Sequence, residues 1–154
     1  MKLSQNFSLK EFTKSQTATR LGIDNTPKGD HLTAAKELFT QVVQHVRENF
    51  GVTRINSGYR SPELNDAIGG SSRSQHCKGQ AVDIECDKAD NLVVAQWIRD
   101  NLEFDQLISE FYTEGDPSSG WVHVSYVSPE DNRKQCLTAQ RVDGKTQYSV
   151  GLPE

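Results

Sequence analysis

Two short apolar segments of the chain each carry one ionisable residue near their centre. Asp83 lies in the run 81–84, and His123 lies in the run 121–125. Side chains alternate between the two faces of a β-strand, so the apolar neighbours point to one face and the ionisable residue to the other. A carboxylate among apolar residues is costly unless it faces a polar cleft or meets a positive partner. The chain is therefore expected to form a sheet with one face in the core and the other at the floor of a cleft.

Helices are expected mainly in the first half of the chain. The clearest signal is an apolar stripe over residues 32–50, which repeats at three- and four-residue steps and stops at Gly51. Shorter helices are predicted after the capping box that begins at Ser8, after the N-cap and proline at Ser61, and over residues 89–102.

Strands are expected mainly in the second half. Alternation and β-branched residues predict strands over residues 52–57, 81–85, 104–111 and 121–127. Asp143-Gly144 is typical of a two-residue hairpin turn. Along the chain the helices come first and are followed mostly by strands, with one helix inserted among them. This order favours an α+β fold in which helices cover a small antiparallel sheet.

Composition excludes several classes of protein. Lys and Arg number 17 against 21 Asp and Glu, and the net charge of −4 argues against a nucleic-acid partner. No apolar run has the length of a signal peptide or a membrane span, so we expect a protein made in the cytoplasm that has no membrane partner. The cysteines are an odd number and imply no disulfide framework: Cys77, Cys86 and Cys136.

His76, Asp83 and His123 form a candidate metal-binding set. Two imidazoles and a carboxylate can hold zinc as three protein ligands, with a fourth position left for water, as in catalytic sites. A structural site would be closed by a cysteine instead. However, Cys77 directly follows His76, and Cys86 faces away from Asp83 by strand alternation. We expect one Zn²⁺ ion, although the same donors also accept cobalt or manganese.

Four separated blocks resemble the zinc D-alanyl-D-alanine peptidase family in its compact phage-type form, which has the lysostaphin- and hedgehog-like zinc fold. The blocks are SGYRSPELN at 57–65, SQHCKGQAVDI at 74–84, FDQLISEF at 104–111 and WVHVS at 121–125. The resemblance implies zinc held by the two histidines and the aspartate named above. It also implies an α+β domain that hydrolyses peptide bonds of bacterial cell-wall stem peptides, as a carboxypeptidase or murein endopeptidase.

The blocks place the motif-bearing core at residues 32–127 of a single domain that spans residues 1–154. A C-terminal hairpin at 135–150 lies outside the resemblance. We expect a monomer whose partner is a peptidoglycan peptide. Without a signal peptide, such a protein would reach the wall as an endolysin after lysis or as part of a phage virion.

The resemblance further implies roles for residues around the cleft. Arg60 matches the family arginine that faces the substrate carbonyl oxygen or carboxylate, where a guanidinium would stabilise an oxyanion. Ser74 resembles the family serine that contacts substrate. Tyr59 and Trp121 are expected to line the cleft, with packing in the core as the alternative for both.

The general base is the weakest match to the family. A zinc peptidase needs a carboxylate that takes a proton from water and passes it to the leaving amine. Many relatives carry that acid three residues before the last histidine ligand, where this chain has Gly120. Glu110 is our candidate instead, ahead of Asp116 and Glu114, and a structural salt bridge is the alternative role for Glu110.

Strand alternation supports the choice of Glu110. It places Glu110 on one face with Gln106 and Ile108, and it places Leu107 and Phe111 in the core. The cleft would then hold a carboxylate beside the metal.

Three functions compete at this point. The first is zinc-dependent hydrolysis of peptidoglycan peptides. The second, motivated by Gly120, is a catalytically inert zinc-containing module that binds the cell wall or builds a phage particle. The third, a hydrolase with Cys77 as nucleophile, leaves Asp83 in its apolar strand unexplained. The sequence does not specify which peptide bond is cut.

Overall fold

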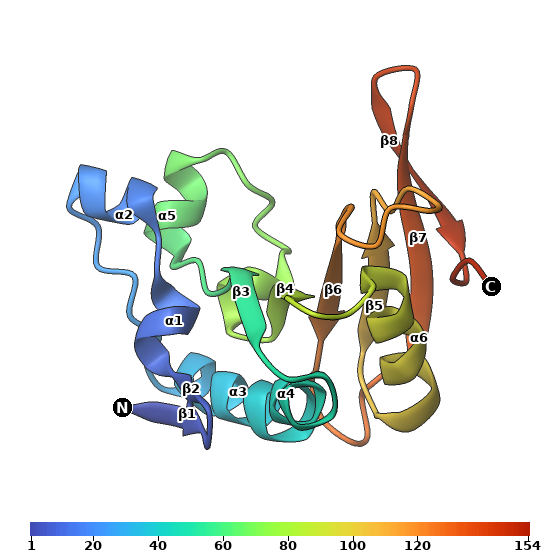
Figure 1. Cartoon of the computed structure of the whole chain (residues 1–154). Coiled ribbons are helices and arrows are strands. Elements are labelled where there is room, and N and C mark those ends of the chain that lie inside the picture. The colour runs from blue at the N-terminus through green and yellow to red at the C-terminus, as the bar shows by residue number, and fades with distance from the viewer.

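The computed structural model describes all residues, 1–154, and its centre is a six-stranded sheet (Figure 1). The strands, in sheet order, are β3 (Thr53–Ser57), β4 (Ala81–Cys86), β6 (Trp121–Ser125), β5 (Gln106–Glu110), β7 (Gln135–Val142) and β8 (Lys145–Val150). A separate two-stranded antiparallel sheet is formed by β1 (Lys2–Ser4) and β2 (Phe7–Ser8). The fold is therefore a mixed one of helices and strands.

The larger sheet is mixed, so the expectation of a wholly antiparallel sheet is wrong. Every neighbouring pair is antiparallel except β5 and β7, which run parallel. After β6, the segment 126–134 passes the start of β5 and brings the chain to the edge of β5 that faces away from β6. There Gln135 donates its backbone N–H to the Asp105 carbonyl oxygen at 2.9 Å. Because β7 thus begins beside the start of β5, the two strands run in the same direction.

The predicted helices are all present. The helical elements are α1 (Leu9–Thr13), α2 (Gln16–Leu21), α3 (Asp30–Leu38), the π-helical turn η1 (Phe39–Val43), α4 (Gln44–Phe50), α5 (Pro62–Ala67), the 3₁₀ turn η2 (Gln75–Lys78) and α6 (Asn91–Asn101). The Ser8 capping box is formed with Glu11, and Ser61 caps α5. The segments α3, η1 and α4 make one continuous helix, which ends at Gly51 with φ of +87°. No helix has the length and apolar character that crossing a bilayer requires.

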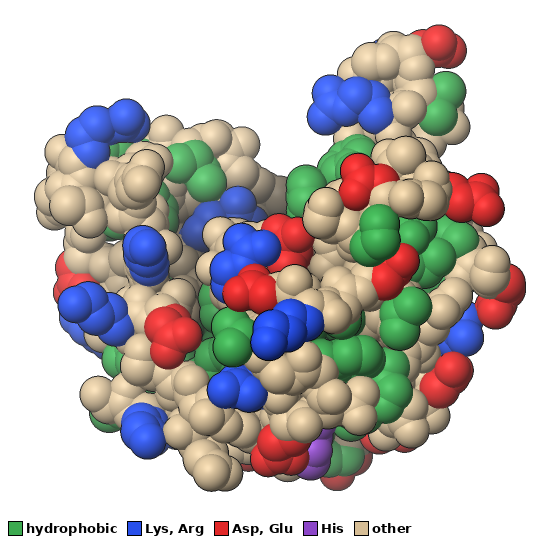
Figure 2. Space-filling model, in the orientation of Figure 1, with side chains coloured by type: hydrophobic (Ala, Val, Ile, Leu, Met, Phe, Trp, Pro, Cys, Tyr) green, Lys and Arg blue, Asp and Glu red, His purple; other side chains and the backbone are tan.

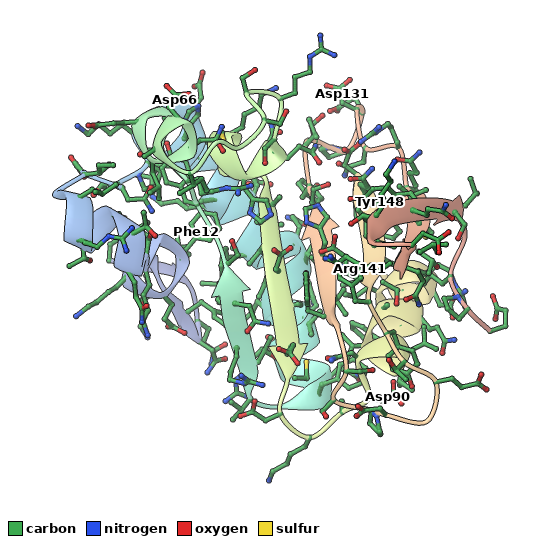
Figure 3. The ribbon with its side chains drawn as sticks, turned by 90° about the horizontal axis from the view of Figure 1, so that it is seen from above. Phe12, Asp66, Asp90, Asp131, Arg141 and Tyr148 are labelled. Atoms are coloured by element: carbon green, nitrogen blue, oxygen red, sulfur yellow. The ribbon has the colours of Figure 1, made fainter.

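The core lies on one side of the large sheet, beneath the long α3–η1–α4 helix and α6. The apolar positions of β4, β5 and β6 pack against these helices through fully buried side chains: Val82, Ile84, Leu107, Val122, Val124, Leu38, Phe39, Val42, Val43, Val46, Val94 and Ile98. The π-helical turn adds three of these buried side chains, Phe39, Val42 and Val43, to the stripe that faces the sheet. The opposite face of the sheet is left open, and Figure 3 looks onto it.

The predicted C-terminal hairpin is confirmed. Asp143 and Gly144 both have positive φ, 51° and 77°, as its two-residue turn requires. The tip of the hairpin rises above the rest of the molecule (Figures 1 and 2). β8 is the last strand of the sheet, and all of its residues are exposed.

Phe111 does not take the core position expected from strand alternation. Its φ is +57°, so the chain leaves the extended conformation directly after Glu110. The ring instead packs on Trp121, with centroids 5.3 Å apart, and the Arg141 guanidinium lies over the Phe111 ring at 5.6 Å from its centroid. The alternation rule fails here because it holds only as long as the strand continues.

Candidate functional site

His76, Asp83 and His123 meet on the open face of the sheet. β4 and β6 pair with Asp83 directly opposite His123, and the turn η2 brings His76 to the same place. His123 Nδ1 lies 2.9 Å from Asp83 Oδ1, and His76 Nε2 lies 3.6 Å from the same oxygen. One donor atom from each residue lies within 4.8 Å of the others. The structure thus brings together three side chains that are distant in the sequence.

The His76 ring is oriented by the backbone. Its Nδ1 lies 2.9 Å from the carbonyl oxygen of Gly58, which can only accept a hydrogen bond. Nδ1 therefore donates a hydrogen bond to this carbonyl oxygen, and Nε2 faces Asp83. Hydrogen bonds of this kind orient the histidine ligands of metal sites. Gly58 sits where a side chain would not fit, since a Cβ there would lie 2.2 Å from the Phe12 carbonyl oxygen.

The Asp83 carboxylate is held in its ionised form. Burial alone would raise the pKa of Asp83, but hydrogen bonds from His123 and His76 lower it to about 2. Its side chain is only 17% exposed and lies between the apolar residues Val82 and Ile84, so the negative charge is largely shielded from water. Two imidazole nitrogens and one carboxylate oxygen, all facing one open cleft, are the donor set that fits a catalytic zinc ion.

A cleft of about 660 Å³ contains these three residues. In Figure 2 the surface is hollowed between the side that carries α2 and α5 and the tall C-terminal hairpin. The other lining residues are Arg73, Ser74, Gln75, Lys78, Gln106, Ile108, Glu110, Trp121, Arg133 and Tyr148. The candidate donors therefore face a space that a substrate can enter.

Glu110 lies in the same cleft as the three candidate ligands. Its carboxylate accepts a hydrogen bond from the indole N–H of Trp121, the residue opposite it on β6. Burial raises the pKa of Glu110, and the negative charge of Asp83 raises it further. The two alternative acids lie elsewhere: Glu114 and Asp116 are exposed in the loop after β5 and do not line the cleft.

The family is decided by comparison with known proteins. A family model described as Peptidase M15 matches residues 5–125 of the chain. The chain belongs to the peptidase M15 family. The resemblance to the zinc D-alanyl-D-alanine peptidases is thereby confirmed, and the family supports a zinc-dependent metallopeptidase. No curated protein matches the chain.

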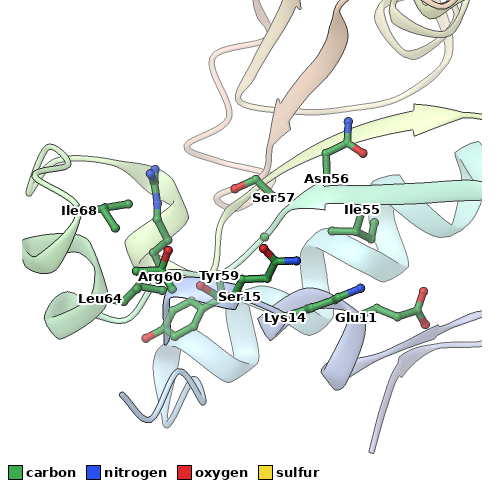
Figure 4. Close-up of a pocket in the computed structure, with 13 residues that line it drawn as sticks. Glu11, Lys14, Ser15, Ile55, Asn56, Ser57, Tyr59, Arg60, Leu64 and Ile68 are labelled. Atoms are coloured by element: carbon green, nitrogen blue, oxygen red, sulfur yellow. The ribbon is translucent and has the colours of Figure 1, made fainter. Parts of the chain in front are cut away.

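Two of the other expected site residues line the cleft of this M15 member. Ser74 and Trp121 are both part of its lining. Arg60 lies beside the cleft and donates a hydrogen bond from Nη2 to Ser74 Oγ at 3.0 Å. Figure 4 shows Arg60 in a neighbouring pocket of about 510 Å³, next to Leu64 and Ile68.

Tyr59 takes the alternative place considered for it, in the core. It is 4% exposed and packs beside Phe12, and its hydroxyl lies 2.9 Å from Nδ1 of His31. The side chains of Tyr59 and Arg60 point in opposite directions (Figure 4). Tyr59 is not part of the lining of the cleft that holds His76.

The cysteines are not part of the candidate metal group. Cys86 faces the core opposite Asp83, as strand alternation predicted. Cys77 is buried, and burial raises the pKa of its thiol. A raised pKa keeps the thiol protonated at neutral pH, which disfavours a role as nucleophile.

Sequence reasoning missed Asp105, which ties the His76 loop to β5. Its buried carboxylate accepts hydrogen bonds from Gln75 Nε2 at 2.8 Å and from the guanidinium of Arg133. The hydrogen bond from Arg133 lowers the pKa of Asp105. Gln75 and Arg133 are 58 positions apart (133 − 75), and no local pattern in the sequence indicates that they share a partner.

Gly120 occupies the position of the acid found in many relatives, and the structure leaves no room there for a side chain. Its φ is +64°, and a Cβ would lie 2.1 Å from the Glu110 carbonyl oxygen. We expect Gly120→Asp to lower the free energy of unfolding by more than the ~1–2 kcal/mol that a left-handed backbone costs a residue with a side chain. Denaturant unfolding would measure the change.

Gly115→Asp is the matched control for this prediction. Gly115 lies in the same loop with φ of +84°, but nothing lies within 4 Å of a Cβ placed there. An equal loss of stability in the two variants would contradict the close approach of Gly120 to β5.

Proposed function

We propose that this M15 member hydrolyses peptide bonds in the stem peptides or cross-links of bacterial peptidoglycan. The observation that carries the proposal is the convergence of His76, Asp83 and His123 in one cleft with Glu110, in a chain of a zinc peptidase family. The peptidoglycan substrate follows from the resemblance to D-alanyl-D-alanine peptidases.

The residues divide into metal ligands and a base. His76, Asp83 and His123 would hold one zinc ion, which when bound polarises the peptide carbonyl and makes water a stronger nucleophile. Glu110 takes the proton of the attacking water and delivers it to the leaving amine. The indole of Trp121 holds the Glu110 carboxylate in place through its hydrogen bond.

Positive residues at the side of the cleft would orient the substrate. The Arg60 guanidinium donates a hydrogen bond to Ser74, which lines the cleft, and this contact supports a role for both in binding a carbonyl oxygen or carboxylate of the peptide. Arg73 and Lys78 also line the cleft. Stem peptides carry free carboxylates, so this charge favours their approach.

Digestion of purified cell walls tests the proposal. The zinc-loaded protein is incubated with peptidoglycan with and without a chelator, and the released fragments are identified by mass spectrometry. We expect soluble peptide fragments that disappear with the chelator and return when zinc is restored. The masses also identify the bond that is cut. A folded, zinc-loaded protein that releases no fragments would contradict the proposal.

Gly120 favours a second candidate, an inert module that binds the wall or forms part of a phage particle. In that case the protein would sediment with cell walls and leave them intact. Glu110 weighs against this candidate, because it supplies a carboxylate within the cleft although position 120 cannot.

A further inference from the structure

The C-terminal hairpin forms one side of the cleft, although it lies outside residues 5–125, which match the family. β7 joins the sheet beside β5, and β8 follows it at the edge. The pairing aligns Trp121, Glu110, Ala139 and Tyr148 in one row across four strands. Residues directly opposite one another on neighbouring strands point to the same face. Tyr148 is therefore on the face that carries Glu110.

Tyr148 is free to contact a ligand. It lines the cleft that contains the candidate metal ligands, and it is 58% exposed. Its hydroxyl makes no hydrogen bond within the chain, whereas the indole of Trp121, at the other end of the row, is bonded to Glu110. Ala139, between Glu110 and Tyr148, projects only a methyl group. An aromatic ring with a free hydroxyl is thus part of the cleft lining, on the C-terminal hairpin, where Figure 3 labels Tyr148.

The sheet fixes how far Tyr148 stands from the reacting centre. Neighbouring strands are separated by about 4.8 Å, so two strand spacings place Tyr148 about 10 Å from Glu110. An extended peptide spans at most ~3.3–3.6 Å per residue. A substrate whose scissile bond lies beside Glu110 would therefore reach Tyr148 about three residues away.

We propose that Tyr148 is a substrate-binding residue that contacts the wall peptide about three residues from the scissile bond. The inference rests on the proposed function and adds to it a preference for long or cross-linked peptides over dipeptides. The ring packs on the peptide, and the hydroxyl can bond to a peptide group. A dipeptide centred on Glu110 is too short to gain from either contact.

Kinetics on two substrates with the same scissile bond test the proposal. One is a cross-linked muropeptide, and the other is the shortest peptide that contains the bond identified in the wall digest. For Tyr148→Ala we expect KM for the long substrate to rise by about three- to tenfold with kcat unchanged, since an aromatic contact is worth ~0.5–1.5 kcal/mol. The short substrate should be cleaved as by the parent protein. Tyr148→Phe, which keeps the ring, should retain most of the preference.

Gln147→Ala is the matched control, because Gln147 is the exposed neighbour of Tyr148 on β8 and points to the opposite face. It should change neither substrate's kinetics. Equal effects of Tyr148→Ala on the long and the short substrate, or no effect on either, would overturn the proposal.

A binding measurement separates this inference from the proposed function. In a Glu110→Gln background, affinity for the intact long peptide is read from tryptophan fluorescence, with and without Tyr148→Ala. A weaker affinity of the double variant supports the role of Tyr148 whatever the outcome of hydrolysis. Unchanged affinity would overturn it. Absence of hydrolysis by the parent protein, by contrast, would contradict only the proposed activity.

Discussion

An Asp83→Asn variant is expected to lose stoichiometric zinc and to lose peptidase activity by about a thousandfold or more. Asparagine keeps the volume of the side chain but removes the charge that both histidines hold in place. It also replaces one of the three candidate donor groups, a carboxylate, with an uncharged amide oxygen, which is a much poorer ligand for zinc. A catalytic metal stabilises the transition state by several kcal/mol, and each ~1.4 kcal/mol is a tenfold change in rate.

Zinc content per chain and hydrolysis of the wall peptide measure the two effects of Asp83→Asn together. Asp87→Asn is the control, because Asp87 is a nearby exposed aspartate that pairs with Arg54 outside the cleft. It should retain both zinc and activity. An Asp83→Asn protein that stays folded, binds zinc fully and remains active would exclude the three-ligand site.

Glu110→Gln is expected to lower kcat by about a hundred- to ten-thousandfold, the usual contribution of general acid–base catalysis. Glutamine can still accept the hydrogen bond from Trp121, so the position of the side chain should be retained. It cannot take a proton from water. Zinc content should be unchanged, because Glu110 is not among the three candidate donors.

Substitution of the alternative acids completes the test of Glu110. Glu114→Gln and Asp116→Asn should leave kcat near that of the parent protein, since neither residue lines the cleft. A large loss of kcat in either variant, together with an active Glu110→Gln protein, would instead assign the role of general base to that residue of the loop after β5.

Two of the three residues of the metal group were predictable from the sequence because each of them breaks a local rule. Asp83 and His123 each lie between two apolar residues of a strand, and strand alternation alone puts both on the open face. What the sequence does not contain is the register that sets them opposite each other. The resemblance to a family supplied that step, together with His76.

The features that could not be predicted depend on contacts between distant segments. The parallel pairing of β5 with β7 leaves no local signal, because either direction of β7 would show the same alternation. The positive φ of Phe111 and the tight approach of Gly120 to the end of β5 are likewise features that only the folded chain shows. Tyr148 stands in a strand with no buried residue, and its sequence therefore has no amphipathic pattern to mark its face.

The position of the hairpin at the end of the strand order has a consequence for how such a protein can diversify. Within the sheet, the hairpin pairs with the other four strands only through β7, and His76, Asp83 and His123 all precede it in the chain. A hairpin of another length, or with another turn, could replace β7 and β8 beside β5 with little disturbance to the candidate metal ligands. If the hairpin contacts the substrate as proposed, substrate preference can thus change at the edge of the sheet while the candidate metal group stays the same.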